Sequence, residues 1–264
     1  MTILITGASG GIGEAFARRL AAEKHDLFLV ARSEDKLKSL CDQLSSKHSI
    51  TAKYFAVDLA QPYSDAQVFD AAQHNGLEID WLINNAGFGS MGDFADLDRE
   101  RELAMIDLNV RALVALTHRF LGPMREKRKG TVINVASTAG EQPLPFMATY
   151  AATKAFVTSF SLAVAEENRP FGIQVLALCP GPTKTNFFEA GNIDKSLAFK
   201  GDQTAEEVVA AALAAVGAGK SKVISGWMNW LVAAASGLAP DSLVTKVVAS
   251  RLRKQYQTNL NRPQ

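Results

Sequence analysis

Residues 3–13 read ILITGASGGIG, and an amphipathic stretch begins within them. Ile3–Thr6 is typical of a buried strand, and Ile12–Glu23 has the apolar spacing of a helix. Glycines let the backbone between them turn tightly and approach a ligand, while the unpaired N–H groups that open a helix attract phosphate. This stretch therefore predicts a phosphate-binding turn between a first strand and a first helix.

The turn matches the dinucleotide-binding fingerprint only in part. Its glycines are Gly7, Gly11 and Gly13, and Phe16 stands where the fingerprint has its last Gly or Ala. Taken alone, these residues leave open a flexible turn rich in small residues.

The same residues also match G-x-S-x-G, the nucleophile elbow of serine hydrolases, with Ser9 as the nucleophile. That chemistry needs a histidine base downstream of the acid. The last histidine of the chain is His118, so the hydrolase interpretation is rejected.

Strand and helix patterns alternate along the whole chain. The predicted strands are Ile3–Thr6, Asp26–Ala31, Ala52–Val57, Trp81–Asn84, Thr131–Ala136, Gln174–Leu178 and Val223–Ser225. The predicted helices are Ile12–Glu23, Glu34–Leu44, Asp65–His74, Arg99–Arg125, Thr149–Asn168 and Ala205–Val216. Such alternation predicts an α/β fold, a doubly wound parallel sheet with helices on both faces. Because no linker or repeat interrupts the pattern, we expect one domain over residues 1–264.

The composition excludes several classes of protein. Among 264 residues, 28 Lys and Arg balance 27 Asp and Glu, which argues against a nucleic-acid-binding protein. Two cysteines are too few for a disulfide framework or a zinc site, so we expect no metal and a reducing, cytoplasmic location. The uncharged run Val223–Pro240 contains Gly, Ser, Asn and Pro, which argues against a membrane span. Peripheral membrane contact through the C-terminal tail stays open.

Arg32 follows the second predicted strand, where an NAD-binding unit places a carboxylate for the ribose 2′-OH. A guanidinium suits a 2′-phosphate instead, so the sequence favours NADP(H). Ser33 is expected to cap the next helix. Glu34 and Asp35 could bind a ribose, which keeps NAD(H) open as the alternative.

Tyr150 and Lys154 are four residues apart at the start of a predicted helix, so they share one face. An adjacent cation favours the phenolate form, and we expect Lys154 to lower the pKa of Tyr150. Ser137 follows the fifth predicted strand, and in parallel sheets reactive groups gather at the carboxyl ends of strands. The three residues are the candidate chemical centre.

With these motifs, the chain resembles the short-chain dehydrogenase/reductase family over nearly its whole length. The matching segments are residues 6–13, 58–59, 84–87, 109, 137, 150–154 and 180–183. The resemblance implies a Rossmann fold with seven parallel strands in the order 3-2-1-4-5-6-7. It places Asp58 at the adenine and Thr183 at the nicotinamide amide. The full set of implied cofactor contacts is Gly7, Ser9, Gly11, Ile12, Gly13, Arg32, Asp58, Asn85, Ala86, Gly87, Tyr150, Lys154, Pro180, Gly181 and Thr183.

The resemblance also implies a mechanism of hydride transfer between nicotinamide and a carbonyl or alcohol, without a metal. Tyr150 would exchange the proton with the substrate oxygen, and Ser137 would hydrogen-bond it. Lys154 would lower the pKa of Tyr150 and bind the nicotinamide ribose, and Asn109 would anchor a water that relays protons. Asn109 could otherwise be an ordinary polar residue of a helix face, and Asp58 a turn residue.

The chain departs from the family at Gly10, where NADP-preferring members often carry a basic residue. Arg32 and the tail that begins at Val223 are similar to a branch near the ketoacyl and hydroxysteroid reductases. A catalytically idle dinucleotide-binding or scaffolding protein is the alternative function. The intact set of candidate catalytic residues favours the enzyme.

Apolar side chains predict a hydrophobic ketone, aldehyde or ketoacyl substrate. They are Leu144, Phe146, Met147, Phe187, Phe188, Trp227, Met228 and Trp230. Residues 184–203 are expected to form a lid and residues 226–264 a C-terminal cap. The family resemblance implies a homodimer or homotetramer, paired through the helices near Arg99–Arg125 and Thr149–Asn168. On the second helix, the expected contacts are Ala151, Ala155, Phe156 and Ser159.

Overall fold

The computed structural model describes residues 1–185, 187, 203–231 and 240–260. Seven strands form one parallel sheet in the order β3-β2-β1-β4-β5-β6-β7, which confirms the predicted topology. The central residue Leu4 pairs with Phe28 on one side and with Leu82 on the other. The strands are β1 (Thr2–Thr6), β2 (Asp26–Ala31), β3 (Ala52–Ala56), β4 (Ile79–Asn84), β5 (Gly130–Val135), β6 (Ile173–Cys179) and β7 (Lys222–Ile224).

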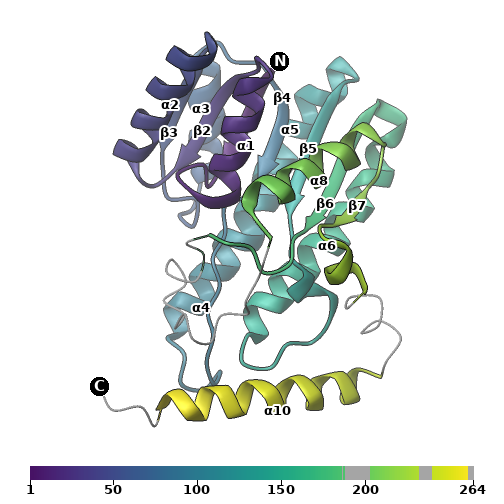
Figure 1. The fold of residues 1–264 in the computed structure, drawn as a ribbon. Coiled ribbons are helices and arrows are strands. Elements are labelled where there is room, and N and C mark those ends of the chain that lie inside the picture. Colours follow the sequence, from purple (N-terminus) through teal and green to yellow (C-terminus); the bar gives the residue numbers. More distant parts are fainter. Residues whose placement is uncertain (186, 188–202, 232–239, 261–264) are drawn as a thin grey trace.

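Helices cover both faces of this sheet (Figure 1). Successive strand residues point to opposite faces, so Ile3 and Ile5 belong to one core while Leu4 belongs to the other. The first core is closed by α1 (Gly11–Ala22), α2 (Glu34–His48) and α8 (Ala205–Gly217). The second is closed by α3 (Ser64–His74), α5 (Leu113–Lys127) and α6 (Ala148–Asn168).

The helical stretch predicted at residues 99–125 is continuous but not uniform. It consists of α4 (Arg99–Ile106), a π-helical segment (Asp107–Ala112) and α5. The wider π turn contains Asn109, which is buried. Such turns are frequent at functional sites.

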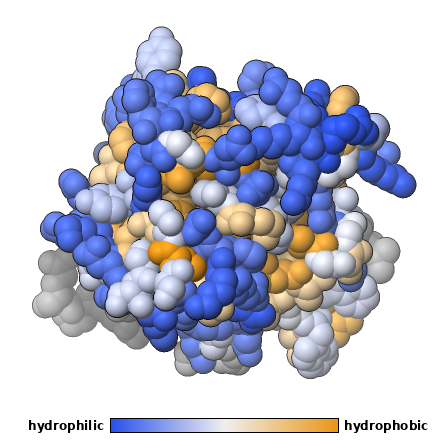
Figure 2. All heavy atoms as spheres, turned by 90° about the horizontal axis from the view of Figure 1, so that it is seen from above, coloured by the Kyte–Doolittle hydropathy of each residue, from blue (hydrophilic) through white to orange (hydrophobic). Residues whose placement is uncertain are grey.

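The C-terminal helix α10 (Asp241–Leu260) lies across the end of the molecule opposite the N-terminus (Figure 1). Seen from above, at the end where the N-terminus lies, the surface is largely hydrophilic, and its apolar residues lie in separate small groups (Figure 2). Among the described helices, none combines the length and the apolar character needed to cross a bilayer. The predicted lid at residues 184–203 falls mostly outside the described residues.

Candidate active site

A cavity of about 1170 Å³ opens at the carboxyl ends of the strands. Its walls come from the segments that follow β1 to β7, α10 included. This is the edge at which parallel α/β sheets bind their ligands. None of the four histidines, all of which are described, lines the cavity, in agreement with the rejection of a hydrolase.

The glycine-rich turn forms one wall of the cavity. Gly7 and Gly11 have φ angles of +64° and +57°, a region that residues with a Cβ rarely adopt. A Cβ on Gly7 would lie 2.8 Å from Asn85 Nδ2 and 2.9 Å from Ala86 Cα. No side chain caps the start of α1 at Gly10, so the first N–H groups of the helix are left for a ligand.

Asn85 and Thr6 hold this turn in place. Asn85 Nδ2 donates to the carbonyl oxygens of Thr6 and Gly7, at 3.0 and 3.3 Å. Thr6 Oγ1 accepts from the backbone N–H groups of Asn85 and Ala86. Asn85 also lines the cavity, so one residue both contributes to the cavity wall and fixes the conformation of the glycine-rich turn.

The segment after β2 lines the cavity with two cations. They are Arg32 and Lys36, and among the described residues neither is paired with a carboxylate. Ser33 also lines the cavity. It is the N-cap residue of α2, as predicted, but its hydroxyl makes no capping hydrogen bond to the helix. Glu34 and Asp35, the acids that kept NAD(H) open, do not line it.

Lys36 is a site residue that the sequence reading missed. It lies four residues after Arg32, in the first turn of α2. Its nearness in sequence to Arg32 could have made it a second candidate for a phosphate, because both residues belong to the connection that begins at the end of β2. The neighbouring acids Glu34 and Asp35 instead favoured the prediction that this segment is only the capped start of a helix.

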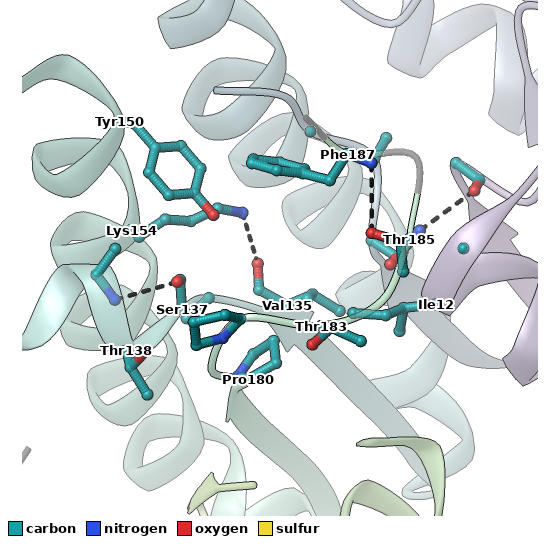
Figure 3. A pocket seen from close by; sticks show the side chains of 18 of the residues that line it. Ile12, Val135, Ser137, Thr138, Tyr150, Lys154, Pro180, Thr183, Thr185 and Phe187 are labelled. Carbon is teal, nitrogen blue, oxygen red and sulfur yellow. Dashed lines mark hydrogen bonds between the residues drawn. The ribbon is translucent and has the colours of Figure 1, made fainter. Parts of the chain in front are cut away.

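Tyr150, Lys154 and Ser137 meet at the middle of the cavity (Figure 3). Tyr150 and Lys154 project from α6 with Lys154 Nζ 5.8 Å from the Tyr150 ring centroid. Nζ donates to the carbonyl oxygen of Val135 at 2.8 Å. Ser137 Oγ accepts from the backbone N–H of Ala139 at 3.1 Å, which fixes the hydroxyl at the end of β5. The three predicted residues are thus brought together.

Burial dominates the acid–base properties of this centre. It raises the pKa of Tyr150 to about 12, an effect that a hydrogen bond with Ser137 partly offsets. It lowers the pKa of Lys154 to about 8, and Cys179 acts weakly in the opposite direction. The expectation that Lys154 would lower the pKa of Tyr150 is therefore wrong for the protein without cofactor. Loss of solvation on burial is the largest cause of the pKa shift of each group.

Asn109 lies behind the cavity wall rather than on it. Its Nδ2 donates to the carbonyl oxygen of Phe88 and to Thr153 Oγ1, at 3.0 and 3.1 Å. Its Oδ1 accepts from the N–H of Phe88 at 3.1 Å. A Cβ on Gly87 would lie 2.9 Å from Asn109 Oδ1 and 3.5 Å from Lys154 Nζ, so both groups border the same backbone.

Most of the site residues that were predicted from the sequence line the cavity. Those that line it are Gly7, Ser9, Gly11, Ile12, Arg32, Asp58, Asn85, Ala86, Gly87, Ser137, Tyr150, Lys154, Pro180, Gly181 and Thr183. Asn109 and Gly13 do not. Gly13 is needed for packing instead, because a Cβ there would collide with the carbonyl oxygen of Gly7. Asp58 also accepts the N–H of Ala60 at 3.0 Å, which is its predicted turn role.

The predicted apolar substrate surface is only partly correct. Leu144, Met147 and Phe187 line the cavity, and the rings of Phe187 and Tyr150 are 5.4 Å apart. Phe146, Trp227, Met228 and Trp230 do not line it, and the last three are exposed. Phe188 falls outside the described residues. In their place, α10 supplies an apolar wall. It lies within the C-terminal cap expected over residues 226–264, although none of its apolar residues was named as part of the substrate surface.

Together, the parallel sheet, the glycine-rich turn and the buried Tyr150–Lys154 pair define a dinucleotide-binding oxidoreductase of the Rossmann type. The family model for the short chain dehydrogenases matches residues 1–196. The chain therefore belongs to the short-chain dehydrogenase family.

Several known proteins are similar to this chain. A Streptomyces virginiae protein named as a monensin polyketide synthase ketoacyl reductase is 39% identical over 184 residues, which are 69% of this chain and 70% of that protein. A very-long-chain 3-oxoacyl-CoA reductase of Mus musculus is 29% identical over 96% of this chain and 81% of its own. Reductases of that name from Laccaria bicolor and Rattus norvegicus are longer, and the match covers 52% and 57% of them.

Among solved structures, a short-chain dehydrogenase from Sphingobium yanoikuyae in complex with NADPH superimposes with a TM-score of 0.80. It is 33% identical, and the match covers 90% of this chain and 94% of that one.

Proposed function

We propose that this protein is an NADP(H)-dependent oxidoreductase that interconverts a carbonyl and a secondary alcohol on a hydrophobic ketone, aldehyde or ketoacyl substrate. One observation carries the proposal. Tyr150, Ser137 and Lys154 meet in the cavity between the glycine-rich turn and an apolar wall. The relatives named as ketoacyl reductases support the same class of substrate.

The residues present fit a phosphorylated dinucleotide. The turn at Gly7 and Gly11 leaves the space and the free N–H groups that a pyrophosphate needs. Arg32 and Lys36 offer two cations at the position of a 2′-phosphate, and Ser33 offers an uncommitted hydroxyl. Bound there, the cofactor supplies or accepts the hydride.

The side chains of the centre handle the proton. In reduction, the Tyr150 phenol donates its proton to the substrate oxygen as negative charge develops there, and its raised pKa keeps it protonated at neutral pH. Ser137 Oγ–H donates to the same oxygen and orients it. Lys154 Nζ holds a positive charge beside the phenolate that results. Asn109 holds the backbone of Phe88 through two hydrogen bonds. It acts as a positioning residue outside the cavity wall and does not touch the substrate.

A catalytically idle dinucleotide-binding or scaffolding protein is the alternative. The two functions are separated by incubating the purified protein with NADPH and hydrophobic 3-oxoacyl thioesters while following absorbance at the nicotinamide band. Substrate-dependent oxidation of NADPH supports the enzyme. Tight NADPH binding without turnover of any ketone would support the idle protein.

Arg32→Ala and Lys36→Ala are each expected to weaken NADPH binding about tenfold to a hundredfold, because each removes a charge-assisted hydrogen bond to phosphate worth roughly 1.5–3 kcal/mol. NADH, which lacks that phosphate, should bind both variants as it binds the parent. Calorimetric titration with the two cofactors measures the difference. Lys38→Ala is the control, since Lys38 is on the same helix but pairs with Asp42. Unchanged NADPH affinity in both variants would contradict the assignment.

The homo-oligomer also stays a proposal, supported by exposed apolar side chains on two helices. Leu103 and Ile106 of α4 are 47% and 43% exposed, and Phe156 and Leu162 of α6 are 42% and 40% exposed. The predicted contact Ala151 faces inward instead. Light scattering after size exclusion should give a dimer or tetramer for the parent and a smaller species for Phe156→Arg. The same substitution at the exposed loop residue Phe94 should leave the mass unchanged.

A further inference from the structure

The C-terminal helix turns one apolar stripe toward the cavity. The stripe consists of Leu243, Val244, Val247, Val248 and Leu252. Their separations of one, four, five and nine residues place them along one face of a helix. From the first to the last, the stripe runs about 14 Å at a rise of 1.5 Å per residue.

The stripe is anchored at one end and open at the other. Leu252 is only 2% exposed, and Val248 packs against the cluster that contains Tyr150 and Met147. Leu243 and Val247 line the cavity and yet remain 55% and 48% exposed. The protein thus leaves apolar surface in contact with water beside its catalytic centre, and a ligand that covers this surface gains free energy.

The other wall of this part of the cavity is apolar as well. It includes Leu144, Met147 and Phe187. The charged side chains of the lining lie elsewhere, because Arg32, Lys36 and Asp58 follow β2 and β3, and Lys154 lies at the catalytic centre. The two walls therefore favour a long uncharged group over a polar or charged one.

We propose that the substrate carries an unbranched acyl chain, which lies along the stripe of α10 while its keto group lies at Tyr150 and Ser137. This inference rests on the proposed function and narrows its substrate class. A compact ketone would reach the catalytic centre without covering the stripe. A chain is needed to cover a surface that extends over about 14 Å.

Chain binding can be tested separately from turnover. Saturated N-acetylcysteamine thioesters from butanoyl to hexadecanoyl, which have no keto group to reduce, are titrated calorimetrically into the full-length protein with NADP⁺ present. The dissociation constant is expected to fall up to about fourfold for each added methylene until the stripe is covered. The same series of 3-oxoacyl thioesters is then assayed with NADPH, and kcat/KM should rise in parallel.

A charge on the stripe should remove the dependence on chain length. Val247→Asp is suited to this test because Val247 is half exposed, so the fold can tolerate the carboxylate. It should weaken binding of the longest thioester at least tenfold more than binding of the shortest. Ser242→Asp puts the same charge on the face of α10 opposite the stripe, at an exposed residue that does not line the cavity, and should keep the dependence.

The proposal would be overturned if affinity and kcat/KM did not change with chain length. It would also be overturned if the two variants weakened binding of the longest thioester equally. Affinity that rises with chain length without any reduction of the 3-oxoacyl series would keep the acyl site and overturn the proposed function instead.

Discussion

Tyr150→Phe is expected to lower the kcat of carbonyl reduction about 10²–10⁴-fold, the usual contribution of a positioned general acid. The substitution removes the only atom that can donate the proton from this position. The ring itself is retained, so its contact with Phe187 at 5.4 Å and its packing in the buried cluster should persist. NADPH affinity should therefore change little. Steady-state kinetics and calorimetric titration of the same preparation measure the two quantities.

Tyr63→Phe is the matched control for this variant. Tyr63 is 79% exposed and does not line the cavity, so loss of its hydroxyl should leave kcat unchanged. Retention of more than a tenth of the parent kcat by Tyr150→Phe would remove Tyr150 from the mechanism. Ser137 Oγ would then be the remaining hydroxyl at the centre.

Lys154→Met should have opposite effects on activity and on stability. Burial lowers the pKa of Lys154 from 10.5 to about 8. In the protein without cofactor, the charged ammonium therefore reduces the free energy of unfolding. Since each pKa unit corresponds to about 1.4 kcal/mol, this cost is about 3 kcal/mol at neutral pH. Methionine is apolar and of similar length, and it should relieve most of the cost. We expect a melting temperature about 5–10 °C higher and loss of turnover.

The sign of the pH dependence follows from the lowered pKa. Below about pH 8, Lys154 is protonated in both the folded and the unfolded chain, so its cost is fully present. As the pH rises from about 8 toward 10.5, the folded protein loses the proton while the unfolded chain keeps it, and the stability contributed by this group rises. The stability gain of Lys154→Met over the parent should therefore shrink across this interval.

Lys38→Met is the control, because Lys38 is exposed and its hydrogen bond with Asp42 raises its pKa. It should give no gain in stability. Scanning calorimetry of the three proteins without cofactor, at pH 7 and pH 9.5, measures the differences. A Lys154→Met variant that is less stable than the parent at pH 7 would show that the hydrogen bond to Val135 outweighs the burial of the charge.

Most of the fold could be predicted from the sequence because the predicted strands are bounded by turn residues and the predicted helices have a regular apolar period, whereas α10 was not among them. Gly7, Tyr150 and Lys154 could be placed because the backbone of a turn and the spacing of a helix are local properties. The resemblance to the family supplied the strand order, which the structure bears out. It also supplied the candidate cofactor contacts, most of which line the cavity.

What could not be predicted depends on tertiary contacts. The pKa of Tyr150 is set by burial on all sides, which no spacing reveals. The apolar wall of α10 depends on where a distant helix packs, although Val244 and Val248 already show a helical spacing. Asn109 lies behind the wall because the π turn and the loop at Phe88 hold it there.

A cytoplasmic location and peripheral membrane contact through residues 226–264 stay predictions. Trp227 and Trp230 are 72% and 56% exposed. Tryptophans are enriched where proteins meet the interface of a bilayer. Co-sedimentation of the full-length protein with liposomes is the measurement for this contact.

The transfer of hydride to a carbonyl carbon is the central claim, and isotope transfer tests it most directly. NADPH that carries deuterium at the nicotinamide C4 position is incubated with the protein and a long-chain 3-oxoacyl thioester, and the product is analysed by mass spectrometry. The account predicts one deuterium on the carbinol carbon when the label is on the transferred face, and none when it is on the other face. A product without deuterium from either labelled cofactor, or no product while NADPH is bound, would contradict it.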